Sequence, residues 1–184
     1  MLDEAANGLR RLASGAVRRY NRLEIIVDAP LPDEPALLVA NHGFGGLVDL
    51  NVFAIFATFD ELKLDRPVIA LTHHLAWLAG VGRIVEAVGA RPASRESAMT
   101  AFAAGQHVLV LPGGDLDAGK PWSRRNDIVF GGRTGFAKLA KDAGVPIVPI
   151  VTAGAGESLL VLSDGQSLAK KLGEDRHLRT KALP

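Results

Sequence analysis

Short apolar runs alternate along this chain with longer stretches of helical periodicity. The runs that predict buried strands lie at 23–27, 37–40, 67–71, 108–111 and 145–151. The stretches that predict helices lie at 2–23, 49–62, 74–88, 94–104 and 133–143. Strands that alternate with helices form an α/β domain, in which the helices cover the faces of a sheet. We therefore expect a single α/β domain over residues 1–184, built on a mixed, twisted sheet flanked by helices.

Local signals define the ends of several elements. Ser94 is a residue type that caps the start of a helix, and Gly144 is the type that ends one. Pro146 and Pro149 interrupt the last apolar run. Because proline cannot donate a ladder hydrogen bond, these two residues predict a sheet edge or a strand start.

Composition excludes several functions. The 184 residues are 48% hydrophobic, enough for one sizeable core, and the net charge of +1 gives no global field that would attract nucleic acid. The absence of cysteine removes disulfides and thiolate chemistry. No apolar segment of about 20 residues runs without a break, and residues 1–22 lack the apolar core of a signal peptide. We expect a protein that is soluble or lies on a surface.

The two ends of the chain raise separate hypotheses. Residues 178–184 finish without a stop element, which favours a chain that lacks a C-terminal part. At the other end, residues 1–23 predict an amphipathic basic helix. Its polar remainder contains Arg10, Arg11, Arg18, Arg19 and Arg22. Such a helix can pack its apolar stripe on the domain or lie on an anionic membrane, and both interpretations can hold for one helix.

The segment after the second apolar run carries the strongest candidate for catalysis. His42 follows the run at 37–40 and is itself followed by a glycine-rich stretch and Asp49. A histidine just past the carboxyl end of a strand lies at the edge of a site, and glycines let the chain turn sharply. Seven residues of unbroken helix would separate His42 and Asp49 by about 10 Å. The chain must therefore bend at the glycines if the two side chains are to form a hydrogen bond. The alternatives are a structural histidine and an N-capping aspartate.

A second glycine-rich stretch follows the strand predicted at 108–111. Gly114, Gly119 and Lys120 have the spacing of a phosphate-binding P-loop, but Pro121 replaces the required hydroxyl residue. We therefore do not expect nucleotide hydrolysis. Gly113 and Gly114 could still present backbone amides to an anion or a thioester carbonyl, or could form an ordinary tight turn.

Other catalytic patterns are missing from the sequence. It contains no Gly-x-Ser-x-Gly elbow and no cysteine, so the usual covalent acyl-enzyme routes lose their nucleophiles. The five histidines have no metal-binding spacing, and we expect no metal. Direct attack by a substrate hydroxyl is the remaining route for acyl chemistry.

Four segments match one protein family in order and spacing. They are Asn41-His42 with Asp49, residues 89–94, Leu111-Pro112-Gly113-Gly114, and residues 132–140 with 145–149. Over residues 35–157 the chain resembles the lysophospholipid and glycerolipid acyltransferases. Six residues separate His42 from Asp49 where the widespread motif has four, which resembles the branch of mono- and diacylglycerol acyltransferases and their bacterial relatives. Gly113 and Asp115 also depart from the glycerol-phosphate enzymes, which carry glutamate and then threonine and arginine in this block.

This resemblance implies a glycerolipid acyltransferase-like fold and an O-acyltransferase without a cofactor. The donor would be acyl-CoA or acyl carrier protein, and the acceptor a hydroxyl of a lipid-like molecule. His42 would be the general base and Asp49 its orienting partner. Backbone amides near Gly113 and Gly114 would stabilise the oxyanion. The cations that could hold donor or acceptor phosphate are Arg133 and, as further candidates, Lys120, Arg124 and Arg125.

Two other functions suit the same sequence. Water in place of the alcohol would make the protein a thioester hydrolase, and loss of catalysis would leave a lipid-binding or acyl-carrier-binding module. The resemblance favours transfer, in bacterial phospholipid or glycerolipid biosynthesis. We expect a cytoplasmic protein held peripherally on the membrane by its N-terminal helix, with no nucleic-acid partner.

Overall fold

The structure, a computed structural model, describes residues 2–43, 50–74, 77 and 82–154 of the 184-residue chain. The chain divides into two compact units. The first consists of residues 1–39, 53–110 and 135–149, and the second of residues 40–52, 111–134 and 150–184. Each unit is therefore assembled from separate stretches of sequence. The prediction of one domain over the whole chain stays a prediction.

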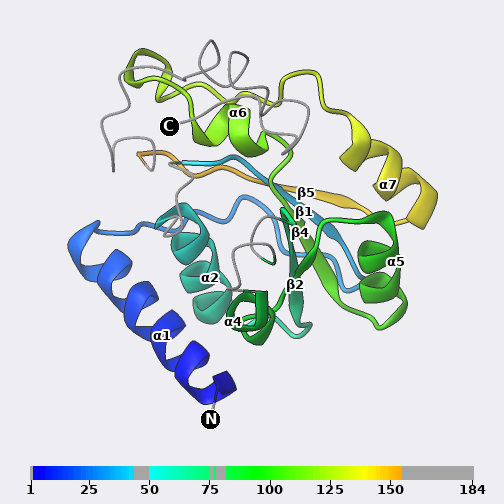
Figure 1. The fold of residues 1–184 in the computed structure, drawn as a ribbon, viewed down its shortest axis with the longest axis horizontal. Helices are drawn as coiled ribbons and strands as arrows, with labels where there is room; N and C mark the ends of the chain where they lie inside the picture. The colour runs from blue at the N-terminus through cyan, green and yellow to red at the C-terminus, as the bar shows by residue number, and fades with distance from the viewer. Residues whose placement is uncertain (1, 44–49, 75–76, 78–81, 155–184) are drawn as a thin grey trace. The chain divides into compact units, whose positions relative to one another are not determined.

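A five-stranded sheet forms the centre of the first unit (Figure 1). Its strands are β1 (Leu37–Ala40), β2 (Val68–Thr72), β3 (Ala90–Pro92), β4 (His107–Val110) and β5 (Ile147–Ile150), in the spatial order β3-β2-β4-β1-β5. The last residues of β1 and β5 pass into the second unit. β1 pairs with β4, β4 with β2, and β2 with β3, all in parallel, with Leu38 opposite Leu109 and Ile69 opposite Val108.

The sheet is thus parallel, which corrects the expectation of a mixed sheet. The physical reason lies in the connections, since α2 (Leu50–Leu62), α4 (Gly82–Ala87) and α5 (Arg95–Ala103) each lie between successive strands. A connection through a helix returns the chain to the same end of the sheet, and the next strand then runs parallel. The expected α/β class with helices flanking a sheet is confirmed.

Helices cover this sheet with small and branched side chains. α5 packs on β4 and β2, and it lies beside α7 (Gly135–Ala143), where the Arg95 guanidinium is 2.5 Å from the Asp142 carboxylate. Ala98 and Ala140 are buried in these two helices. In the strands, Leu37, Leu38, Val108 and Leu109 are completely buried. Burial of side chains of this size stabilises a fold by roughly 1.5–3 kcal/mol each.

Several element ends match the sequence signals. Ser94 Oγ accepts a hydrogen bond from the Ser97 amide at 3.0 Å and caps α5 as predicted. Gly144 has φ +65° directly after α7, a conformation that side chains rarely adopt, and it ends that helix. β5, with Pro149 inside it and Pro146 just before it, lies at the sheet edge. These three predictions are confirmed.

One expected strand is absent, and one observed strand was not expected. Residues 23–27 form no strand, and Ile26 and Val27 are exposed. A short apolar run becomes a strand only where a sheet edge accepts it and a core covers one face, and this run has neither. Conversely, the three-residue β3 was not predicted because Ala90, Arg91 and Pro92 carry no strand pattern. It forms because β2 offers it a parallel ladder.

The N-terminal helix α1 (Leu2–Tyr20) is shorter than predicted and does not bury all of its expected apolar stripe. Val17 and Ser14 are buried, while Leu12 and Tyr20 are 76% and 89% exposed. Arg18 donates to the Ala57 carbonyl and lies 3.4 Å from Glu61, so α1 is attached to α2. The helix also packs against α4. Among the described residues, no helix combines the length and apolarity needed to cross a bilayer.

A buried histidine makes the stability of the first unit depend on pH. His107 is 3% exposed, and its Nδ1 accepts a hydrogen bond from the Ala36 amide at 3.1 Å. Burial, reinforced by the positive charge of Arg66, lowers the pKa of His107 below its ordinary 6.5. The folded protein therefore keeps this imidazole neutral at a pH where the unfolded chain protonates it.

We expect the free energy of unfolding to fall as the pH drops below about 6.5, and to level off below the folded pKa of His107. His107→Asn preserves an acceptor for the Ala36 amide and removes the titration. Denaturant unfolding of this variant at a series of pH values should therefore give a flatter curve than wild type. His74→Asn, at an exposed histidine, is the control. Equal curves for wild type and His107→Asn would contradict the prediction.

Candidate active site

A buried ion pair lies in the second unit. Asp117 is in the short helix α6 (Gly114–Ala118), and Lys120 follows two residues after the helix ends. Lys120 Nζ lies 2.7 Å from Asp117 Oδ1, and the two residues are 6% and 0% exposed. Charged side chains are almost never buried to this extent unless they are paired. The pair is therefore a built feature of this unit.

The ion pair holds both polar backbone groups of His42. The His42 amide donates to Asp117 Oδ2 at 2.6 Å, and the His42 carbonyl accepts from Lys120 Nζ at 2.9 Å. Asp117 Oδ1 also accepts from the Val129 amide at 3.0 Å. The backbone of residue 42 is thus fixed from two sides by residues that lie more than 70 positions away in sequence.

Asn41 fixes the same segment from the other direction. Its side-chain amide forms two hydrogen bonds with the backbone of Thr152, one from the Thr152 amide at 2.8 Å and one to the Thr152 carbonyl at 3.0 Å. The Asn41 carbonyl accepts from the side chain of the buried Asn51. The Asn41 side chain therefore continues the pairing of a strand beyond the point where β1 ends. Sequence reasoning missed Asn51, Asp117 and Thr152 as parts of this site.

The histidine side chain itself is half-buried, as expected for a residue at the edge of a site. Asp49, its predicted partner, lies outside the described residues, together with the rest of residues 44–49. The pairing of His42 with Asp49 therefore stays a prediction.

The glycine turn after β4 has little space for side chains. A Cβ on Gly113 would meet the side chain of Asp117 and would lie 2.6 Å from the Val129 carbonyl oxygen. Gly114 has φ +49°, and its amide donates to the Leu111 carbonyl at 3.1 Å. The structure thus shows a tight turn in which the Gly114 amide is already bonded within the protein.

The basic residues named from the sequence occupy different positions. Arg133 donates to the carbonyls of Pro112 and Gly113 at 3.3 and 2.7 Å, and it pairs with Asp115 at 2.6 Å. Its side chain is 34% exposed. It therefore braces the glycine turn and keeps one surface open, whereas Lys120 is enclosed by its partners within the second unit.

Arg124 and Arg125 belong to the segment around the short helix η1 (Trp122–Arg124). Arg124 pairs with Asp127 at 2.8 Å, and both side chains are more than half exposed. The Arg125 guanidinium lies 4.5 Å from the centre of the Trp122 ring. Within the described ranges, no group of three or more histidines and carboxylates is placed to hold a metal ion.

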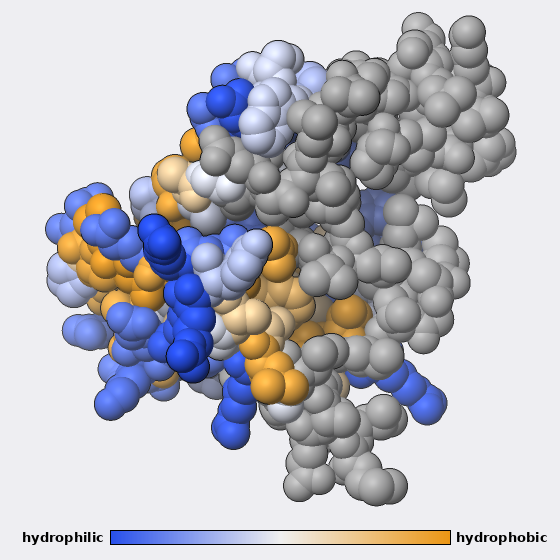
Figure 2. Space-filling view, turned by 90° about the vertical axis from the view of Figure 1, so that its left-hand side faces the viewer, coloured by the Kyte–Doolittle hydropathy of each residue, from blue (hydrophilic) through white to orange (hydrophobic). Residues whose placement is uncertain are grey.

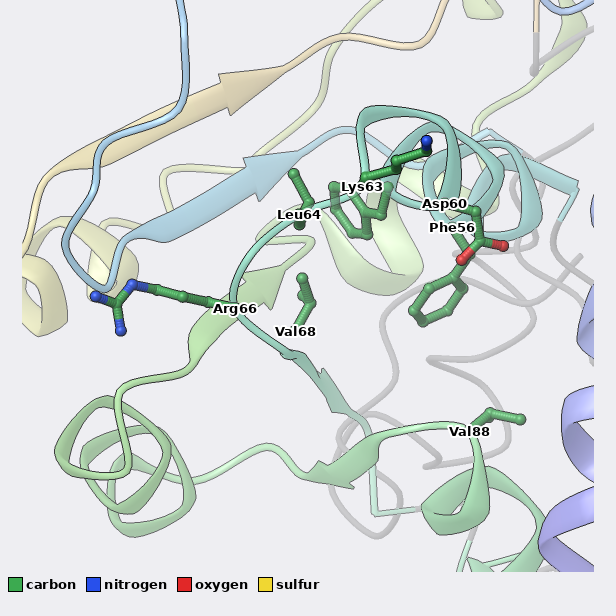
Figure 3. A pocket seen from close by; sticks show the side chains of 8 residues that line it. Phe56, Asp60, Lys63, Leu64, Arg66, Val68 and Val88 are labelled. Carbon is green, nitrogen blue, oxygen red and sulfur yellow. The ribbon is translucent and has the colours of Figure 1, made fainter.

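A pocket of about 300 Å³ lies in the first unit, near the end of α2 and the start of β2 (Figure 3). Its apolar lining is Phe56, Phe59, Leu64, Val68 and Val88, with Asp60, Lys63 and Arg66 as its polar residues. Arg66 extends away from Val68 and donates to the carbonyls of Asp33 and Gly105. None of the residues predicted for the site lines this pocket.

A parallel α/β fold with a histidine fixed just beyond a strand agrees with the acyltransferase class that the sequence resembles. The family model described as Acyltransferase matches residues 20–153. The chain therefore belongs to the Acyltransferase family, and the predicted resemblance is confirmed.

The chain is similar to several curated proteins, some of which are named as enzymes of lipid synthesis. The chain is 29% identical over 166 residues to a chicken (Gallus gallus) protein named "DGAT1/2-independent enzyme synthesizing storage lipids", covering 90% of this chain and 48% of that protein. The human protein of the same name is 28% identical over 151 residues, covering 82% and 45%. An uncharacterised protein of Mycobacterium leprae is 32% identical over 139 residues, covering 75% and 38%. The chain thus spans about half the length, or less, of these curated relatives. No solved structure matches it significantly.

Proposed function

We propose that this protein transfers a fatty acyl group from a thioester, acyl-CoA or acyl carrier protein, to a hydroxyl of a lipid-like acceptor. Family membership and the storage-lipid names of the relatives support acyl transfer into lipids. The observation that carries the proposal is the backbone of His42, which is fixed by Asp117 and Lys120. A general base must be held in place relative to its substrate, and this histidine is held by charged groups.

In the proposed reaction, the imidazole of His42 takes the hydroxyl proton as the hydroxyl oxygen attacks the thioester carbonyl carbon. The tetrahedral intermediate then collapses, the new ester bond stays, and the carbon–sulfur bond breaks. The departing sulfur receives the proton from the imidazolium. Asp49 would hold the imidazole in the correct tautomer and stabilise its charged form. A base of this kind contributes about 10²–10⁴-fold to the rate.

We assign donor binding to the glycine turn and to the exposed cations around it. Arg133 fixes the carbonyls of Pro112 and Gly113 and retains an exposed surface, and Arg124 is more exposed still. A single guanidinium group can bind two oxygens of one phosphate through two parallel hydrogen bonds. The bonded amide of Gly114 argues for a shaping role of that residue, so Gly113 is the better candidate for facing the oxyanion.

Product analysis tests the proposal directly. The protein is incubated with labelled acyl-CoA, or with acyl carrier protein, and a panel of lysophospholipids, diacylglycerol, fatty alcohols and glycosylated lipids. Mass spectrometry should find a labelled ester that forms only with an acceptor. Labelled free fatty acid at the same rate with or without an acceptor would identify a thioester hydrolase. Donor binding without any turnover would identify a binding module.

We also propose that α1 holds the enzyme on a membrane, where a long-chain donor and a lipid acceptor accumulate. Leu12 and Tyr20 project from this helix and are exposed together with Arg11 and Arg19. On the molecular face in Figure 2, hydrophobic areas lie directly beside strongly hydrophilic ones. Exposed apolar side chains beside arginines match the chemistry of an anionic bilayer surface.

Vesicle binding should follow from these residues. The protein should sediment with anionic vesicles at low salt and dissociate as salt rises, because each arginine contributes on the order of 1 kcal/mol that salt screens. Removal of residues 2–22, or the double substitution Leu12→Ser with Tyr20→Ser, should abolish most binding. Serine at Ile128 and Val151, two apolar residues exposed elsewhere, is the matched control. Equal binding by the truncated protein would assign the membrane contact to another surface.

A further inference from the structure

We infer that the buried Asp117–Lys120 pair is a positioning device for the catalytic base. It forms hydrogen bonds with the amide and the carbonyl of His42, and through them it positions the residue that carries the imidazole. This inference rests on the proposed function, in which His42 is the base. It gives Lys120 a different role from the phosphate-binding role that its place beside a glycine turn suggests.

Both halves of the pair are needed to hold the histidine. The His42 amide donates to Asp117 Oδ2, and the His42 carbonyl accepts from Lys120 Nζ at 2.9 Å and, over a longer 3.4 Å, from Asn41 Nδ2. Because the two partners are joined at 2.7 Å, they form one unit with a donor and an acceptor at fixed separation. Two hydrogen bonds to one residue restrict its rotation as well as its position. The direction of the Cα–Cβ bond, from which the imidazole extends, follows from the orientation of this backbone.

The burial of the pair separates this role from two simpler ones. Lys120 is 6% exposed and its ammonium bonds Asp117 and His42, so it offers little surface to a substrate phosphate. Simple stabilisation is also a poor explanation, because apolar residues of similar size often stabilise a protein as well as a buried ion pair does. Positioning of His42, the predicted base, explains why a charged pair is buried at this place.

Neighbouring residues hold the pair in place beside His42. Asp117 Oδ1 accepts from the Val129 amide as well as from Lys120, which anchors the carboxylate to the returning chain. Position 113 carries no side chain, which leaves the space that Asp117 occupies. The Asn41 side chain bonds the backbone of Thr152 and also donates to the His42 carbonyl at 3.4 Å, so it holds the segment by contacts that do not involve the pair. Loss of the pair should therefore misplace His42 without releasing the whole segment.

Steady-state kinetics of Lys120→Met and Asp117→Asn test this assignment. Each variant should lower kcat by on the order of 10–10²-fold, as small misplacements of reacting groups do, and leave the donor KM within about twofold. Asp142→Asn is the control, because Asp142 forms a partly exposed ion pair with Arg95 within the first unit and belongs to no part of the proposed site. This control should behave as wild type. A raised donor KM with unchanged kcat in Lys120→Met would instead assign Lys120 to substrate binding and overturn the inference.

The same substitutions in a His42→Ala background distinguish failure of this inference from failure of the proposed function. If the pair acts through the imidazole, Lys120→Met should change the residual rate of His42→Ala by less than about twofold. A full additive loss in that background would refute the inference. If His42→Ala alone keeps wild-type activity, the proposed function fails, whatever the behaviour of the pair.

Hydrogen exchange followed by mass spectrometry supplies a readout that does not need activity. In Asp117→Asn and Lys120→Met, peptides that contain His42 should exchange faster, while peptides from β4 keep their wild-type protection. Unchanged exchange at His42 would contradict the inference. If one variant fails to fold, which the loss of protection in β4 would reveal, the other variant still decides the question.

Discussion

Replacing His42 with alanine is expected to abolish acyl transfer while the protein stays folded. Loss of a general base should lower kcat by about 10²–10⁴-fold. The fold should tolerate the change because the bonds that fix residue 42 use its amide and carbonyl, which alanine retains. Turnover with labelled donor and thermal unfolding should be measured on the same preparation. His74→Ala, at an exposed histidine, should match wild type in both measurements.

Two results would contradict the assignment of His42. A His42→Ala protein that unfolds far below the wild-type temperature would make the residue a structural histidine. A folded variant with full activity would exclude the residue from catalysis and with it the proposed mechanism. Asp49→Ala should give a smaller loss than His42→Ala, since an orienting partner is less essential than the base that it orients.

A single methyl group at position 113 should damage both stability and activity. Gly113→Ala would place a Cβ against the side chain of Asp117 and 2.6 Å from the Val129 carbonyl, where no flexible chain end can move aside. Overpacking of this kind costs about 1–3 kcal/mol. Because the clash also displaces Asp117, the hold on His42 should weaken and kcat should fall.

Gly135 provides the matched control for this prediction. It begins α7, and a Cβ there would meet nothing within 4 Å. Gly135→Ala should be neutral, or should stabilise by up to about 1 kcal/mol, because alanine is the better helix former. Denaturant unfolding and kcat of both variants give the comparison. A Gly113→Ala protein as stable and active as wild type would show that the crowded geometry at position 113 does not constrain the chain.

The same crowding explains one departure from the family pattern. Glycine stands at position 113 where the sequence comparison with glycerol-phosphate enzymes expects glutamate. In this chain the space beside that residue belongs to Asp117, which reaches across to His42. A glutamate at 113 would have to displace the carboxylate that holds the proposed base.

Local patterns predicted the elements better than the site. The alternation of apolar runs with helical stretches predicted β1, β2, β4 and β5. Ser94 correctly marked the start of α5, and Gly144 the end of α7. These signals are local, because a cap or a turn depends on neighbouring residues. The apolar run at 23–27 was misleading, since strand formation depends on a distant partner that a short window does not contain.

The site was only half visible in the sequence. The motif around His42 predicted the family, which is confirmed, and proposed His42 as the base, which stays a prediction, but it gave no indication of what holds the histidine. Lys120 contacts the His42 carbonyl from 78 positions away, and in the sequence it looked like part of an incomplete P-loop. One signal was available, the acid–base spacing of Asp117 and Lys120, which suits a pair on one side of a helical turn. Their joint burial, which gives the pair its meaning, depends on tertiary packing.

The attachment of residue 42 through main-chain atoms has a consequence for engineering. The backbone of residue 42 forms the hydrogen bonds that hold it, whereas its side chain carries the proposed reactive group. We therefore expect that a different side chain at this position would leave those backbone hydrogen bonds in place. Cysteine, aspartate or lysine at this position would extend from the same backbone, which is bonded to the Asp117 carboxylate and the Lys120 ammonium. The scaffold is therefore a natural starting point for installing a different nucleophile or base by changing a single codon.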